Sequence, residues 1–189
     1  MQLIYYDKSF GYIYAFYFLV LPMKRILFGV FCTFVFGSKV YCQNLYDNFY
    51  FNMPLSEAKQ VLKSESQKLK NISFGPMTSY AFRKKSLVDH DGKLVSINVW
   101  SKKNLTLLEA ETYLIKSRKH FESNKYKTVY AQENWSKPVL VKKNLPCIRF
   151  VDSDKTVVVE VDPRGQGGVY NVFVTFYDYK WFLKKAQGK

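Results

Sequence analysis

Cysteine and histidine are scarce in this chain, and both shortages narrow the chemistry that it can carry. The 189 residues include three cysteines and two histidines. Cys32 and Cys42 lie near the N-terminus, so the chain beyond residue 42 holds only Cys147. A domain with a single thiol has no internal disulfide, which excludes a disulfide-stabilised scaffold. Its stability must therefore come from the burial of apolar side chains.

Long hydrophobic runs are also missing. Residues 11–21 and 26–37 are apolar, but each run is well short of the roughly 20 residues that cross the hydrocarbon core of a bilayer. Lys24 and Arg25 separate the two runs, and this pair would cost about 5–7 kcal/mol at mid-membrane. The sequence therefore argues against a single membrane helix that joins both runs.

Residues 23–42 have the order of a secretory signal peptide, with a basic start, a short apolar run and a polar exit. Val40 and Cys42 suit the positions before a cleavage site, so we expect the mature protein to begin at Gln43. Two explanations of residues 1–22 stay open: an extension added by a misplaced start before Met23, or a long signal segment. The expected location is periplasmic or secreted, and uncleaved anchoring in the membrane is the alternative.

Acidic residues are few. The chain has 15 aspartates and glutamates against 29 lysines and arginines, which gives a net charge of +14. Removal of residues 1–42 takes away four basic residues and one acidic residue, which leaves +11. Export argues against a nucleic-acid role, and no nucleic-acid motif is present. We expect weak binding to acidic glycans, anionic membrane surfaces or an acidic protein, although a solvated basic surface without a partner is the alternative. The candidate contacts are Arg83, Lys84, Lys85, Lys102, Lys103, Lys142 and Lys143.

No catalytic constellation stands out, and the sequence predicts no cofactor or metal site. His90 stands between two aspartates in a turn, and His120 is near the end of a predicted helix. Cys147 opens an apolar strand, which predicts a buried thiol with nothing nearby to activate it. The glycines of residues 165–168 follow Arg164 and precede a strand, so they predict a hairpin loop rather than a phosphate cradle.

Two segments have the spacing of amphipathic helices, residues 55–70 and 107–122. In each, apolar residues fall at i, i+3, i+7 and i+14, which places them on one face. Thr106 and Glu109 form the pattern of a capping box at the start of the second helix. The residues expected to face the core are Leu55, Ala58, Leu62 and Leu69 in the first helix, and Leu107, Ala110, Leu114 and Phe121 in the second.

The pattern of the rest of the chain predicts β-strands. A hairpin with a somewhat long loop is expected around Asp91–Gly92, and further strands are expected at residues 125–131, 147–151, 156–161 and 169–177. In the last of these, Tyr170, Val172, Val174 and Phe176 form the expected core side, and residues 162–168 form the loop before it. The sequence predicts one α+β domain over residues 43–189, with two helices packed on one face of a mainly antiparallel sheet.

The two helix openings are similar to each other and to a known family. Residues 52–62 match residues 104–114 at five positions, which suggests a helix-then-strands unit present twice. The run from Asn52 to Leu62 resembles the opening of small envelope proteins of the SmpA/OmlA type and of β-lactamase-inhibitor proteins. The resemblance covers about ten residues in each copy, and Asn52 and Pro54 depart from the glycine and threonine of the family's turn. It implies a binding or assembly role, and no inhibitor residues carry over.

Together these observations predict an exported, non-enzymatic protein with a binding or structural role in the cell envelope or outside the cell. Two alternatives stay open. One is a small extracytoplasmic hydrolase whose site combines residues distant in sequence, such as His90 and Cys147 with a carboxylate. The other is an uncleaved, membrane-anchored protein.

Overall fold

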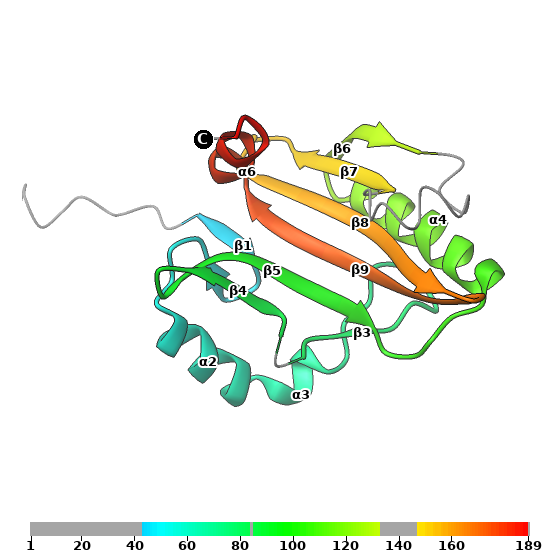
Figure 1. Ribbon diagram of the computed structural model, residues 1–189, viewed down its shortest axis with the longest axis horizontal. Coiled ribbons are helices and arrows are strands. Elements are labelled where there is room, and N and C mark those ends of the chain that lie inside the picture. The colour runs from blue at the N-terminus through cyan, green and yellow to red at the C-terminus, as the bar shows by residue number, and fades with distance from the viewer. Residues whose placement is uncertain (1–42, 84, 133–146, 189) are drawn as a thin grey trace, which may run out of the picture. The chain divides into compact units, whose positions relative to one another are not determined.

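The computed structural model describes residues 43–83, 85–132 and 147–188. These residues form an α+β fold around a seven-stranded antiparallel sheet, in the order β3-β5-β9-β8-β7-β6, with β4 paired to β5 beside β3 (Figure 1). The strands are β3 (Tyr80–Ala81), β4 (Leu87–His90), β5 (Lys93–Ser101), β6 (Tyr126–Ala131), β7 (Ile148–Asp152), β8 (Val157–Gln166) and β9 (Val169–Asp178). A small hairpin of β1 (Asn44–Tyr46) and β2 (Phe49–Tyr50) precedes the first helix.

The helices lie on both sides of this sheet. The core side is covered by α2 (Leu55–Ser64), α3 (Ser66–Leu69) and α4 (Leu107–Ser123), while α6 (Tyr179–Ala186) follows β9 at the C-terminal end. The core is apolar and continuous from the β1–β2 hairpin to β7. Within the described residues, no helix has both the length and the apolar character that a membrane span requires.

The second helix begins as predicted. The Thr106 hydroxyl accepts a hydrogen bond from the Glu109 backbone N–H, and the Glu109 carboxylate accepts one from the Thr106 N–H. Lys103 Nζ lies 2.6 Å from the same carboxylate. Lys103, the Thr106 N–H and the Thr106 hydroxyl, which donates to Glu109 Oε2 at 3.1 Å, lower the pKa of the Glu109 carboxyl to about 2, with the lysine as the main cause. The Glu109 carboxylate therefore stays ionised at ordinary pH, and the capping box stays intact.

Two expectations about the helices need correction. The first helix ends at Ser64, and a break at Glu65 separates it from α3, which redirects the chain so that Leu69 reaches the core. Leu107 is 42% exposed because it occupies the first turn of α4, while Tyr113 and Ser117 are buried on the same helix instead. Ser117 is tolerated there because its hydroxyl bonds the Tyr80 phenol at 2.9 Å.

Both long hairpins are tighter than the sequence suggested. Asp91 and Gly92 form a two-residue turn in which both φ angles are positive, at 51° and 72°. The partner of β5 is thus β4, with no long loop between them. Residues 162–166 continue β8 rather than forming a loop, and the turn is confined to Gly167–Gly168. Positive φ at both central residues gives the twist that a two-residue hairpin needs, and glycine adopts it at little cost.

Just before each of the helices α2 and α4, the chain pairs with a strand of the sheet. The Met53 carbonyl accepts a hydrogen bond from the Leu94 N–H at the start of β5, and the Asn52 N–H donates to the Leu94 carbonyl. Leu105 exchanges both backbone hydrogen bonds with Tyr170 at the start of β9. Met53 and Leu105 are both buried, and they occupy matching positions in the two similar sequence segments. Since β5 and β9 are antiparallel neighbours, the two segments join adjacent strands in the same way, which is in keeping with a repeated helix-then-strands unit.

Candidate functional site

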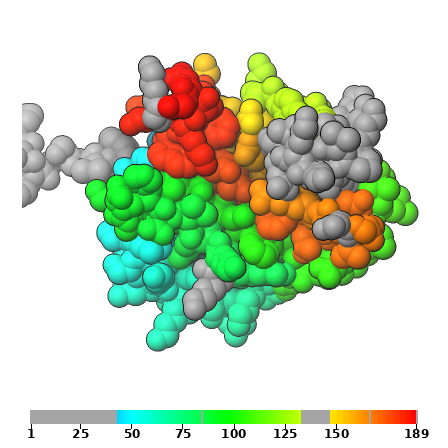
Figure 2. All heavy atoms as spheres, in the orientation of Figure 1, coloured from blue at the N-terminus to red at the C-terminus, as the bar shows by residue number. Residues whose placement is uncertain are grey.

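The side of the sheet away from α4, called here the second face, carries polar and aromatic side chains. Successive side chains of a strand point to opposite faces of the sheet. Val172, Val174 and Phe176 of β9 therefore enter the core, as predicted, and the residues between them lie on the second face. Cross-strand pairing then aligns side chains of β5, β9 and β8 in rows on this face. Figure 2 views the molecule in the same orientation as Figure 1.

One row combines two arginines with two aromatic rings, and we call it the arginine–aromatic row: Arg83, Trp100, Phe173 and Arg164. Trp100 and Phe173 are cross-strand partners with ring centroids 5.0 Å apart. The Arg83 guanidinium carbon lies 4.9 Å from the Trp100 ring centroid, and that of Arg164 lies 4.8 Å from the Phe173 ring centroid. Stacking of this kind holds a guanidinium in place while its N–H edge stays free to donate.

The two arginines differ in what they already bind. Arg164 donates from Nε to Asp162 Oδ2 at 2.6 Å. Arg83 is exposed, and its guanidinium makes one long hydrogen bond of 3.4 Å to the Ser101 carbonyl. Among the described residues no carboxylate pairs with Arg83. Arg83 is therefore the arginine of the row with free capacity for an anion.

Asp162 is the buried acid of this face. Its side chain is 6% exposed, and Oδ1 has no hydrogen-bond partner in the described part of the chain. Burial raises the pKa of Asp162 to about 6, although the neighbouring Arg164 charge opposes the shift. Desolvation thus outweighs the ion pair here.

A third arginine of the second face, Arg149, lies on β7 outside the row. Arg149 donates from Nε and Nη2 to Glu160 Oε1 at 2.8 and 2.7 Å, and its guanidinium carbon lies 4.9 Å from the Phe182 ring of α6. Tyr177 stacks on Trp181 with an interplanar angle of 11°. These contacts attach α6 to the second face and neutralise Arg149, so Arg149 is structural.

The basic residues predicted to contact anions have different surroundings. Lys85 is exposed in the same turn as Arg83. Lys102 donates to the Asn71 side chain, and Lys103 supports the α4 cap. Lys84, Lys142 and Lys143 lie outside the described residues. Among the described members of the predicted set, Arg83 alone lies over an aromatic ring.

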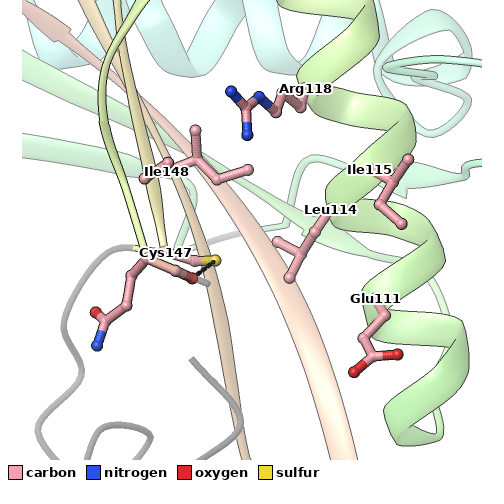
Figure 3. A pocket seen from close by; sticks show the side chains of 8 residues that line it. Glu111, Leu114, Ile115, Arg118, Cys147 and Ile148 are labelled. Carbon is pink, nitrogen blue, oxygen red and sulfur yellow. Dashed lines mark hydrogen bonds between the residues drawn. The ribbon is translucent and has the colours of Figure 1, made fainter. Parts of the chain in front are cut away.

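The candidate hydrolase residues do not come together. His90 is the last residue of β4, with Nδ1 3.0 Å from Asp91 Oδ2, and His120 packs on Phe74 and Phe121. Cys147 lines a separate cleft of about 300 Å³ between α4, β6 and β7 (Figure 3). The described residues contain no group of three or more metal-binding side chains.

The cleft in Figure 3 is an apolar groove with charged residues at its edge. Leu114 of α4 points toward Cys147 and Ile148, and Ile115 also lines the groove, with Arg118 above and Glu111 below them on the helix in this view. The Arg118 Nε atom is bound to Glu122 at 2.9 Å. Burial, reinforced by the charge of Asp162, raises the pKa of the Cys147 thiol to about 12. The thiol is therefore protonated and unreactive, as predicted for a buried cysteine.

Sequence reasoning missed the partners in the arginine–aromatic row. It placed Phe173 on the non-core side of its strand but had no means of pairing it with Trp100, 73 residues away. It also assigned Asp162 and Arg164 to a loop, whereas they belong to β8. The available signal was the polar and aromatic alternation within β5 and β9. Register between strands was the missing information.

Comparison with known proteins gives no match: no protein-family model, curated protein or solved structure matches this chain. The resemblance to the envelope and inhibitor proteins therefore stays a prediction.

Proposed function

We propose that this is an exported, non-enzymatic binding protein of the cell envelope or the extracellular space, and that it holds an acidic partner at the arginine–aromatic row. The observation that carries the proposal is the exposed Arg83 guanidinium, stacked on Trp100 without a carboxylate partner among the described residues. The basic–apolar–polar order of residues 23–42 supports export.

The chemistry of a stacked arginine favours an anion with oxygen acceptors. Guanidinium presents five donors in a rigid plane, which matches a carboxylate or sulfate with two parallel hydrogen bonds. Because the Trp100 ring fixes the plane, less side-chain entropy is lost on binding than for a free arginine. The excess of basic residues brings acidic polymers to the surface, and Arg83 then supplies a defined contact.

The test compares two cations of the same turn. Arg83→Ala removes the stacked guanidinium, while Lys85→Ala removes an equal charge two residues away that has no ring partner. We expect the first to weaken binding to heparin, a model acidic polysaccharide, by about 10- to 150-fold, since a charge-assisted hydrogen bond contributes about 1.5–3 kcal/mol. The second should cost less than about threefold, as exposed charges contribute little. Affinities from a calorimetric or surface-binding titration would measure both.

A third variant separates geometry from charge. Arg83→Lys keeps the charge but loses the planar fork, so it should behave like Arg83→Ala rather than like the wild type. Equal losses for Arg83→Ala and Lys85→Ala would show that only net charge matters, and the proposed contact would be wrong. Unchanged thermal melting of each variant is the control for folding.

A further inference from the structure

A second basic site lies apart from the arginine–aromatic row, between the β4–β5 hairpin and α6. It is an open hollow of about 820 Å³, within the range of ligand sites in proteins. No residue of the row lines it. In Figure 2 the spheres of α6, in red, lie beside those of the β4–β5 hairpin, in green.

Three lysines converge on this hollow, Lys93 from β5 and Lys184 and Lys185 from the last turn of α6. All three are exposed, and none takes part in an ion pair within the described residues. Lys185 Nζ lies 5.0 Å from the centroid of the Trp181 ring, which holds it at the hollow. The hollow therefore carries a surplus of positive charge with free donors.

The other ionisable groups of the hollow are already engaged. Asp91 pairs with His90 at 3.0 Å, and Asp89 Oδ2 accepts a hydrogen bond from the Gly92 N–H at 3.3 Å. Asp89 belongs to β4 and Asp91 to the turn that follows it. They reduce the positive potential on the hairpin side, so the lysines of α6 become the main attraction for an anion.

Apolar side chains share the lining with these charges. Val88 and Trp181 both line the hollow, and Val88 is 41% exposed. On α6 itself Leu183 is 40% exposed, and it stands between Lys180 and Lys184 at the i, i+3 and i+4 spacing of one helix side. A free inorganic anion needs no such apolar surroundings. An anion attached to acyl chains does, because lysines contact the headgroups while leucine and tryptophan enter the interface.

We propose that this hollow binds the anionic headgroup of a membrane lipid, with α6 lying against the bilayer surface. Lys93, Lys184 and Lys185 contact the headgroup, and Leu183 enters the acyl boundary. The attraction acts at short range, so it weakens as salt shortens the Debye length from about 8 Å at 0.15 M to about 3 Å at 1 M. The site is independent of the acidic partner proposed for the arginine–aromatic row.

Vesicle flotation tests the site, with phosphatidylcholine alone and with phosphatidylglycerol added. The wild type should bind the mixed vesicles and not the neutral ones. A triple variant, Lys93→Ala with Lys184→Ala and Lys185→Ala, should lose binding on the order of 100-fold, because each lysine at an anionic surface contributes roughly fivefold. The matched control changes Lys59, Lys63 and Lys70 to alanine, which removes the same charge from exposed positions of α2 and just after α3.

Three results would overturn the proposal. The first is an equal loss in the matched control, which would assign the binding to net charge. The second is complete competition by inorganic phosphate at the ionic strength of a chloride control, which would mean a free-anion site. The third is unchanged binding of a Leu183→Asn variant, which keeps the charge and should weaken binding, because unchanged binding would exclude contact with acyl chains.

Discussion

At the residue scale, the charged side chains of the second face differ in how far each is buried and in whether its hydrogen-bonding atoms have partners. Arg149 and Glu160 satisfy one another, whereas Asp162 is buried beside Arg164 with one carboxylate oxygen lacking a partner in the described residues. Its pKa is raised to about 6 from 3.8. A carboxylate that is more acidic in the unfolded chain than in the folded one opposes folding wherever it is ionised.

This gives a prediction for the pH dependence of stability. The folded state favours protonated Asp162, so its contribution is largest below about pH 4 and is lost as pH rises to about 6. The drop is on the order of 3 kcal/mol, since one pKa unit corresponds to 1.4 kcal/mol. Asp162→Asn stays neutral and still offers an acceptor to Arg164, so it should lack this drop. Urea unfolding of both proteins between about pH 4 and about pH 7 would measure it, and parallel curves would contradict the assignment.

At the element scale, α4 shows why helical spacing alone does not define the buried face. Leu107 has the right spacing but is exposed, while Leu114 is 4% exposed and Ile115, the next residue, is 57% exposed. Both line the cleft of Figure 3. The two side chains differ in exposure because each points away from the helix axis in a different direction, and only that of Leu114 points toward the sheet.

The adjacent pair supplies a matched test of this packing. Leu114→Ala should lower the free energy of unfolding by about 2–4 kcal/mol, because it removes buried methyl groups and leaves a cavity. Ile115→Ala removes a similar volume from an exposed position and should cost less than about 1 kcal/mol. Chemical denaturation measures both. Equal losses of unfolding free energy in the two variants would contradict the exposed position of Ile115 and mean that this side chain is buried by a contact in solution.

At the scale of the whole molecule, Gln43, the expected mature N-terminus, is itself bound to the fold. Gln43 contacts the fold through its side-chain amide, which donates to the Thr156 carbonyl, and its own carbonyl accepts from the Phe51 N–H. Cleavage between Cys42 and Gln43 would therefore leave the small β1–β2 hairpin intact.

We accordingly predict that the exported protein begins at Gln43. Intact mass measurement of the form recovered outside the cytoplasm decides this, because each residue removed changes the mass by a known amount. A product that retains Lys24 and Arg25 would indicate an uncleaved anchor or a protein that is not processed. A substitution of Lys24 and Arg25 by neutral residues should reduce export, since the basic start orients the signal.

By itself the sequence determined the α+β class, where both long helices begin, the capping box at Thr106 and the core side of β9. These depend on local spacing and on hydrogen bonds between near neighbours, which are fixed by a few adjacent residues. It also predicted the buried, inert thiol of Cys147, because apolar neighbours in a strand indicate burial.

Only the tertiary structure decided which distant side chains meet. The stacking of Arg83 on Trp100, the Trp100–Phe173 pair and the convergence of Lys93 with α6 all depend on strand register and on how α6 folds back beside β9. A shift of one residue in the register of β5 against β9 would turn Trp100 to the opposite face relative to Phe173. Register results from the packing of the whole core, and no local pattern of residues encodes it.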